Sequence, residues 1–285
     1  MAKKRLKVAR ALEPNAGGHK LAARQLRAMV NAFENEFKRE ALKIAARFCR
    51  MDKAADAPPQ SSKQLQRLAL AQMTELRARL LIKLGKRPRK VSYWFCRKLL
   101  MQISADQRRA MTRAGISNAW LKQKWTVPVI KGQYISPGAA KKIPDFVDWS
   151  TSLITKLCEA SANKVQNAIA DGISKGHSLS RLTARIEGLE NMDPDRAARV
   201  ALDQSCKLNQ FIQVENAKSL GVKEGIWVHV PGKYTSRESH MEMNGKRFNL
   251  EEGMYDPEVG FHVMPAELPY CRCVFRAVLP GFLVD

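Results

Sequence analysis

The C-terminal third of this 285-residue sequence contains the side chains best suited to chemistry. Cys271, Cys273 and His240 are soft metal ligands, and His229 or His262 could supply a fourth. Zinc prefers four such ligands in a tetrahedron, but the Cys-x-Cys spacing is tighter than the usual gap of about two to four residues. The alternative is that both cysteines lie on a strand, point to opposite faces and act as small buried hydrophobic residues. We therefore expect no cofactor, with zinc as the weaker alternative.

His240 is also the centre of a catalytic alternative. With Arg237 and Lys246 it could cleave nucleic acid, the histidine acting as general acid or base and the cations stabilising charge on the phosphate. A lone histidine in a polar turn is more often structural, however, and the sequence offers no evident acid or base partner. We expect the protein not to be an enzyme.

The remaining cysteines and the hydropathy indicate the compartment. Cys49, Cys96, Cys158 and Cys206 are isolated, which is untypical of a disulfide scaffold and favours a reducing cytoplasm during synthesis. No run of about 18 apolar residues is present, so we expect no membrane span. The basic N-terminus has no apolar segment after it, so a signal peptide is not expected.

Positive charge is concentrated in the first half of the sequence. Residues 1–150 contain 33 Lys and Arg against 10 Asp and Glu, whereas residues 151–285 contain 16 against 17. Such a basic half favours a polyanionic partner, either nucleic acid or an acidic protein surface. The alternative is that the cations only solubilise exposed helix faces.

One part of this charge forms a compact cluster that we predict to bind a partner or DNA. Its members are Lys83, Lys86, Arg87, Arg89 and Lys90. A helix is predicted to end at this point, and cations suit the C-terminal end of a helix dipole. Part of the cluster therefore needs no ligand.

The spacing of apolar residues predicts an α+β fold with a basic, mostly helical region over 1–144. An arm is expected over 1–19, a linker over 52–62, and helices over 20–51, 63–84, 92–103 and 105–114. Trp120, Trp125 and Tyr134 lie in a segment over 120–144 that is typical of a hairpin or extended crossover. These aromatic side chains could stack on bases, but such clusters are more often a small core or a protein interface.

The second half is predicted to be a compact domain over 145–285, with helices packed on a small antiparallel sheet. The best-defined helix covers 194–220, because Asp193 suits the N-cap, Pro194 the first turn and Gly221 the C-terminal end. Further helices are expected over 145–175 and 178–190, and strands over 225–230 and 272–279.

An ordered set of residues follows the best-defined helix. The set comprises Trp227, Arg237, His240, Gly245, Phe248, Cys271 and Cys273. In this order and at these spacings it resembles the C-terminal domain of the phage Mu F-like head-morphogenesis, or minor head protein, family. The resemblance covers about residues 145–279, and the set is expected to be structural.

The resemblance implies a minor head protein of a tailed bacteriophage, associated with the portal and acting in head assembly, DNA packaging or delivery. The implied partners are the portal protein, a major capsid or scaffolding protein, and double-stranded DNA, without a membrane. Such a protein would be assembled in the host cytoplasm and end in the virion. The alternatives are a DNA-binding virion protein without sequence specificity and a nuclease-like enzyme centred on His240.

The sequence departs from the family pattern at three places. Leu202-Asp203-Gln204 stands where the family usually has Arg-Thr-Glu, Lys233 and Tyr234 stand where an acidic residue is usual, and Tyr270 replaces an Asn. Two expected carboxylates are therefore lost or shifted. Chemistry that needs them is not expected here, whereas the scaffold could be kept.

Overall fold

The computed structural model describes residues 8–14, 16–48, 62–231 and 236–281. The predicted linker, apart from Ser62, and the departures at Lys233 and Tyr234 lie outside these residues. The chain divides into two compact units, which are described separately. One comprises Met1–Ala23, Tyr93–Asp148 and Ala198–Asp285, and the other comprises Arg24–Ser92 and Trp149–Ala197.

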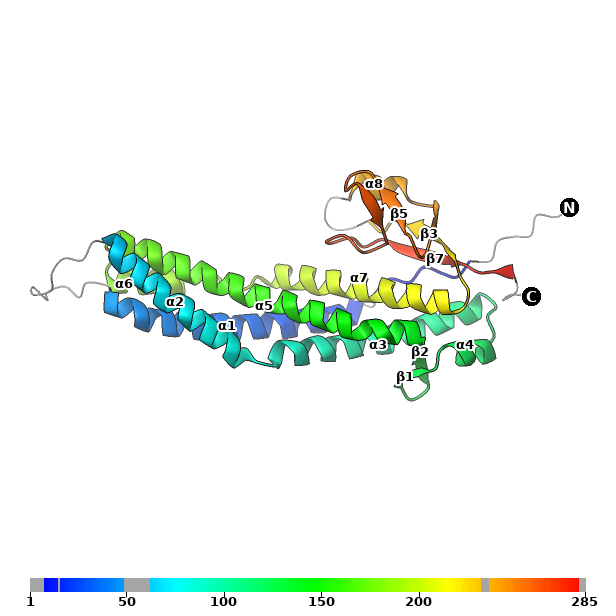
Figure 1. The fold of residues 1–285 in the computed structure, drawn as a ribbon, viewed down its shortest axis with the longest axis horizontal. Helices are drawn as coiled ribbons and strands as arrows, with labels where there is room; N and C mark the ends of the chain where they lie inside the picture. The colour runs from blue at the N-terminus through cyan, green and yellow to red at the C-terminus, as the bar shows by residue number, and fades with distance from the viewer. Residues whose placement is uncertain (1–7, 15, 49–61, 232–235, 282–285) are drawn as a thin grey trace, which may run out of the picture. The chain divides into compact units, whose positions relative to one another are not determined.

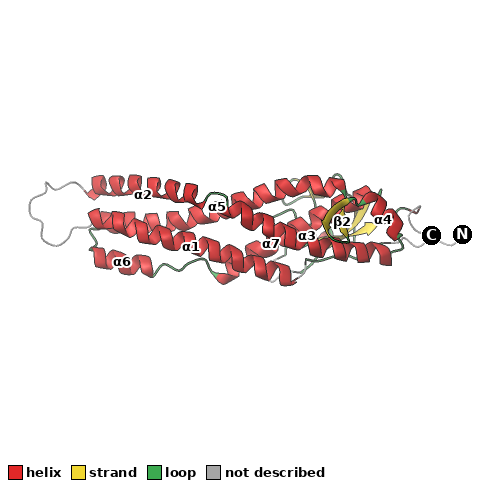
Figure 2. Ribbon diagram, turned by 90° about the horizontal axis from the view of Figure 1, so that it is seen from below, coloured by secondary structure: helices red, strands yellow, loops and turns green. Residues whose placement is uncertain are grey.

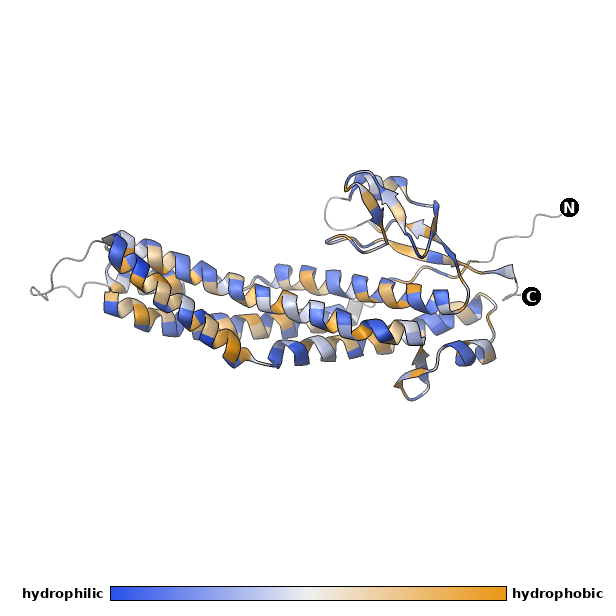
Figure 3. Cartoon of the chain, viewed as in Figure 1, coloured by the Kyte–Doolittle hydropathy of each residue, from blue (hydrophilic) through white to orange (hydrophobic). Residues whose placement is uncertain are grey.

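In the unit of Arg24–Ser92 and Trp149–Ala197, the described regular elements are all helices. It is built from parts of α1 (Ala16–Phe48) and α5 (Pro137–Ser174), together with α2 (Ser62–Leu84) and α6 (Leu179–Glu187). Ser178 caps α6 by accepting a hydrogen bond from the backbone N–H of Arg181. Apolar side chains on one face of each helix are buried, and polar residues alternate with them along the ribbons (Figure 3).

The other unit contains the described strands together with helices. Its helices are α4 (Asn118–Lys124), α8 (Glu238–Glu242), most of α3 (Arg87–Arg113) and α7 (Pro194–Ser219), and the first residues of α1 and α5. Strands β1 (Val127–Ile130) and β2 (Gln133–Ile135) form the predicted hairpin, which Figure 2 shows in yellow near α4. Trp125 is 2% exposed and its indole N–H faces the carbonyl of Asn216 at 3.3 Å. The hairpin aromatics therefore include a core residue, and base stacking by Trp125 is excluded by its burial.

A small antiparallel sheet follows α7, as the sequence predicted (Figure 1). Its strand order is β4-β3-β7, and Trp227 on β3 lies opposite Phe275 on β7. The strands are β3 (Glu224–Val228), β4 (Arg247–Asn249) and β7 (Val274–Val278), and β5 (Met254–Asp256) pairs with β6 (Phe261–Val263) in a separate hairpin. Val8 forms a β-bridge with Val278, so the described end of the N-terminal arm extends the sheet.

Close packing of aromatic rings explains a glycine at the centre of this sheet. A Cβ on Gly225 would lie 2.9 Å from Cε1 of Phe248 and 3.0 Å from Cδ2 of Phe275. The two rings meet edge to face, with centroids 6.2 Å apart. Only a residue without a side chain permits that approach.

Several predicted helix limits were wrong, and local capping explains them. The arm ends earlier than residue 19, because α1 begins at Ala16. The helices predicted over 92–103 and 105–114 are a single helix, α3, which begins at Arg87 because Pro88 is tolerated in a first turn. The helix predicted from 145 begins at Pro137, because Ser136 Oγ accepts a hydrogen bond from the N–H of Ala139.

The remaining differences concern domains and strands. The predicted boundary between 144 and 145 falls inside α5, and the two units take residues from both sides of it. The predicted strand over 225–230 is β3, which begins one residue earlier and ends at Val228. The last strand begins at Val274, so Cys271 and Cys273 precede it.

Candidate functional site

The family-motif residues gather around Trp227, which is fully buried on β3. Its ring meets that of His240 edge to face at 5.3 Å and that of Phe248 at 5.7 Å. Gly245 closes the turn between α8 and β4 with a φ of 80°, and its N–H donates to the carbonyl of Trp227 over 2.8 Å. The sequence set is thus one packed cluster in space.

Helix α8 presents His240 to the interior of this cluster. Arg237 is the N-cap residue, and its guanidinium donates to the carbonyl of Pro269 over 3.3 Å. The carboxylate of Glu258 accepts a hydrogen bond from the backbone N–H of Ser239 over 2.9 Å, which places negative charge at the start of the helix. Both contacts fix the helix that carries His240.

Both ring nitrogens of His240 are engaged, and the residue is only 2% exposed. Nε2 lies 3.1 Å from Oδ2 of Asp256, which is fully buried. Nδ1 lies 3.3 Å from the sulfur of Cys271 and 3.6 Å from that of Cys273. The other oxygen of Asp256 accepts the N–H of Glu258 over 2.9 Å, so this carboxylate is held from two sides.

A second histidine approaches the same sulfurs. Nδ1 of His229 lies 3.5 Å from the sulfur of Cys273, and its Nε2 lies 3.1 Å from Oγ of Ser236. His262, the other histidine predicted as a ligand, is exposed and packs on Tyr255. Of the two alternatives, the structure therefore brings only His229 to the cysteines.

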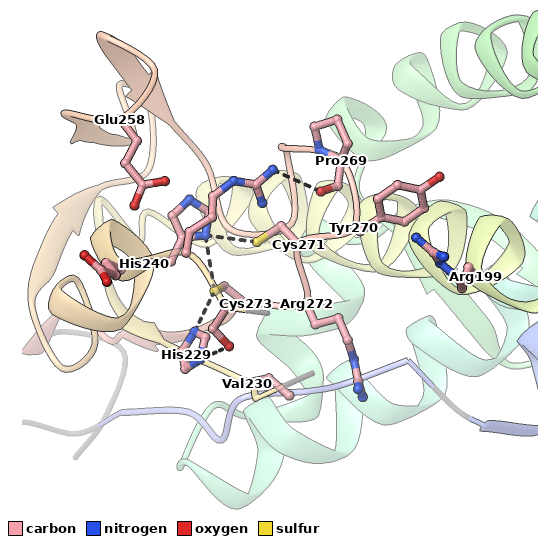
Figure 4. Close-up of a pocket in the computed structure, with 13 residues that line it drawn as sticks. Arg199, His229, Val230, His240, Glu258, Pro269, Tyr270, Cys271, Arg272 and Cys273 are labelled. Carbon is pink, nitrogen blue, oxygen red and sulfur yellow. Dashed lines mark hydrogen bonds between the residues drawn. The ribbon is translucent and has the colours of Figure 1, made fainter. Parts of the chain in front are cut away.

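The interpretation of the cysteines as strand residues on opposite faces was wrong. Both precede β7, in a turn where the N–H of Cys271 donates to the carbonyl of Leu268 and Tyr270 adopts a φ of 61°. The backbone lacks strand geometry there, so the side chains do not alternate. Both thiols are buried and both face His240 (Figure 4).

The electrostatics of the cluster favour one thiolate. Hydrogen bonding to Cys273, together with the hydrogen bond and charge of His240, lowers the pKa of Cys271 to about 4 against the effect of burial. Burial alone acts to lower the pKa of His240, but the hydrogen bond and charge of Cys271 and the charge of Asp256 raise it overall. By contrast, burial raises the pKa of the isolated Cys206 to about 12. The cluster is therefore suited to hold negative charge on sulfur.

A cavity of about 550 Å³ opens beside these ligands. Three arginines line it: Arg199 stacks on Tyr270 at 5.0 Å, Arg237 bonds Pro269, and Arg272 lies 3.7 Å from Glu13. The remaining lining residues are His229, Val230, Ser236, Glu238, His240, Glu258, Cys271 and Cys273. The candidate metal ligands thus border a cavity lined by three arginines and two glutamates (Figure 4).

The basic cluster lies at the turn between α2 and α3. Lys83 is in the last turn of α2 and pairs with Glu36 at 2.5 Å. The helix-dipole explanation therefore holds for Lys83. It does not hold for Arg87, Arg89 and Lys90, which lie at the start of α3, where the dipole disfavours cations and the first turn has no acidic residue. These three side chains and Lys86 are exposed.

Sequence reasoning missed three residues of the site. Asp256, Ser236 and Glu258 lie in the polar stretch between the predicted strands, where no motif marks them. It also gave no role to Asp203, whose carboxylate accepts the N–H of Tyr270 over 2.6 Å. That bond holds the segment before Cys271 against α7. Both of its residues, Asp203 and Tyr270, stand at positions where the sequence departs from the family pattern.

Residues 163–276 match the family described as Phage Mu protein F like protein. The match lies in the C-terminal region of this chain, the region that resembles this family in sequence. The match includes every residue of the cluster around Trp227 and relates the chain to phage head-morphogenesis proteins.

A protein of Haemophilus influenzae described as uncharacterized is 29% identical over 144 residues, which cover 50% of this chain and 31% of that protein. The chain thus matches about a third of that relative's length. No solved structure matches.

Proposed function

We propose that this protein is a minor head protein of a tailed phage, bound near the portal and acting in head assembly. The observation that carries the proposal is the Mu F-like region over residues 163–276, whose motif residues pack as one cluster around Trp227. Because these side chains are mostly buried, their role is to maintain a scaffold that partner proteins recognise from outside.

The buried position of His240 favours a structural role over catalysis. A general acid or base must reach the proton that it transfers. Nε2 of His240 faces Asp256 and Nδ1 faces the two thiols, so neither nitrogen is directed at a substrate. Lys246, the cation invoked for cleavage, is exposed and does not line the cavity. These contacts support the proposal that the protein is not a nuclease.

The basic cluster supports an anionic partner. Arg87 and Lys90 carry charge at the positive end of α3, where an external anion would relieve the unfavourable interaction. The partner would be an acidic surface of the portal, of a scaffolding protein or of the major capsid protein. The same feature supports a second candidate, contact with the phosphates of packaged DNA without sequence readout. No helix in the described part of the chain has a segment apolar enough to cross a membrane.

A binding experiment at two salt concentrations tests the proposal. The purified chain is captured with the portal protein of the phage that encodes it, and separately with duplex DNA. We expect portal binding to weaken with salt but to persist, because apolar contacts beside the charged ones are not screened, whereas DNA binding should weaken steeply. Binding to DNA alone would contradict the assembly role and support the second candidate.

Paired variants identify the contribution of the cluster. Arg87→Gln with Lys90→Gln removes two exposed cations at the start of α3, and Arg97→Gln with Lys98→Gln removes two exposed cations farther along the same helix. We expect only the first pair to weaken binding to the anionic partner. Equal losses in both pairs would show that overall charge, not the cluster, governs binding.

A further inference from the structure

We propose that Cys271, Cys273, His240 and His229 bind one Zn²⁺ ion, which fastens the segment before β7 to α8 and to the end of β3. The inference does not depend on the role in head assembly. Two sulfurs and two imidazole nitrogens are a ligand set that zinc takes in structural sites. All four donors come from the unit that contains the sheet.

The distances among His240, Cys271 and Cys273 fit a single ion, and His229 approaches one of the two sulfurs, so its ring would shift toward the other donors to complete the set. With zinc–sulfur and zinc–nitrogen bonds of about 2.3 and 2.0–2.1 Å, tetrahedral angles place a nitrogen about 3.6 Å from a sulfur. Nδ1 of His240 lies 3.3 and 3.6 Å from the sulfurs of Cys271 and Cys273, and Nδ1 of His229 lies 3.5 Å from that of Cys273. Donor atoms of His240, Cys271 and Cys273 all lie within 4.8 Å of one another. Among the described residues, no other group of three such side chains meets that criterion.

The outer contacts of both histidines match those of metal ligands. A ligating imidazole usually bonds a carboxylate, hydroxyl or carbonyl through its second nitrogen, which fixes the ring and the tautomer. His240 meets Asp256 through Nε2 at 3.1 Å, and His229 meets Ser236 through Nε2 at 3.1 Å. In both rings Nδ1 is left to face sulfur. This pairing of orientations is expected of a metal site and is not needed for packing.

The tight Cys-x-Cys spacing is compatible with the site because of the turn. The positive φ of Tyr270 and the hydrogen bond from Cys271 to Leu268 direct both thiols to the same side. The bond from the N–H of Tyr270 to Asp203 holds the turn in place. The tight spacing would separate the two thiols only if the chain were extended, and the backbone at Cys271 and Cys273 is not extended.

A metal would add stability to a part of the fold that is built from short strands. Strands β4, β5 and β6 contain three residues each, and short strands are marginal on their own. Because the ligands come from three separate segments, the free energy of metal binding becomes free energy of folding. Four protein ligands leave no open position, so the ion would be structural, not catalytic.

Metal analysis of the purified chain tests the site. The protein is isolated under reducing conditions, incubated with zinc, desalted and analysed by mass spectrometry for metal content. We expect about one zinc per chain, as a Cys₂His₂ site binds one ion. We also expect Co²⁺ to give the absorption of a tetrahedral site with thiolate ligands. Wild-type protein that is folded and metal-free after this treatment would overturn the proposal.

Variants distinguish the ligands from other buried thiols. Cys273→Ala and His240→Ala should lose the metal, and His229→Gln should weaken binding and change the cobalt spectrum. Cys206→Ala is the matched control, because Cys206 is a buried cysteine on the neighbouring helix α7 and lies outside the proposed set. Retention of zinc by a folded Cys273→Ala protein would overturn the assignment.

If a ligand variant fails to fold, the wild-type protein still decides the question. A chelator should lower its thermal transition temperature, and added zinc should restore it. An unchanged transition would contradict the stabilising role. Because these measurements use the isolated chain, their outcome is separate from that of the portal-binding experiment.

Discussion

Replacement of Asp256 by Asn is the most informative single change at the site. The carboxylate is fully buried, and it accepts two hydrogen bonds, one from Nε2 of His240 at 3.1 Å and one from the N–H of Glu258 at 2.9 Å. Asparagine has nearly the same shape but only one acceptor group. Turned toward Glu258, its NH₂ group meets a backbone donor. Turned toward His240, it meets Nε2, which can accept only if the ring proton moves to Nδ1, the atom that faces the two thiols.

The size of the expected loss of stability follows from the hydrogen bond that is lost. A buried donor without an acceptor costs about 1–3 kcal/mol. A protein of about 150–250 residues loses about 2–4 °C in transition temperature for each kcal/mol, so a decrease of several degrees is expected. If zinc is bound, loss of the outer contact to His240 should also reduce metal affinity by about 10–100-fold.

Differential scanning calorimetry measures the first effect and chelator competition measures the second. Asp145→Asn is the matched control, because Asp145 is exposed on α5 in the same unit. The variant with Asn at 256 should melt below both wild type and control. Equal transition temperatures for the two variants would refute the argument that Asp256 orients His240.

Two further changes test the packing and the charge. Gly225→Ala should destabilise the sheet by about 1–3 kcal/mol, because the new Cβ would lie 2.9 Å from an aromatic carbon. The effect is measured as a lower transition temperature. Unchanged stability would show that the rings can move apart. Arg87→Gln with Lys90→Gln should lower the salt dependence of DNA binding, the slope of log affinity against log salt, by about 2 in fluorescence anisotropy. The Arg97→Gln and Lys98→Gln pair should leave it nearly unchanged, and an equal decrease would contradict a localised contact.

Strong local signals allowed part of the fold to be predicted. Helix α7 has Asp193 before it, Pro194 at its start and Gly221 after it, and its predicted limits agree with the structure within one residue. Prolines lie inside two helices whose starts were predicted too late. Pro88 lies in the first turn of α3, and Pro144 lies inside α5.

The candidate site was only partly predictable for a physical reason. His240, Cys271 and Cys273 were identified from residue type, but their convergence depends on a turn with positive φ at Tyr270, which the sequence does not signal. Asp256 ends a strand of three residues, which is too short to show a hydrophobic period. Its partnership with His240 arises from tertiary packing across 16 positions of sequence.

The presence of the chain in phage heads tests the proposed function most directly. Heads are purified from cells infected with the phage that encodes the chain and from cells infected with a mutant of that phage that lacks the portal gene. The amount of the chain in each preparation is then measured by mass spectrometry. If the chain is bound near the portal, it is present in heads with a portal and absent from heads without one. Equal amounts in both preparations would contradict association with the portal, and absence from both would contradict a role as a head component.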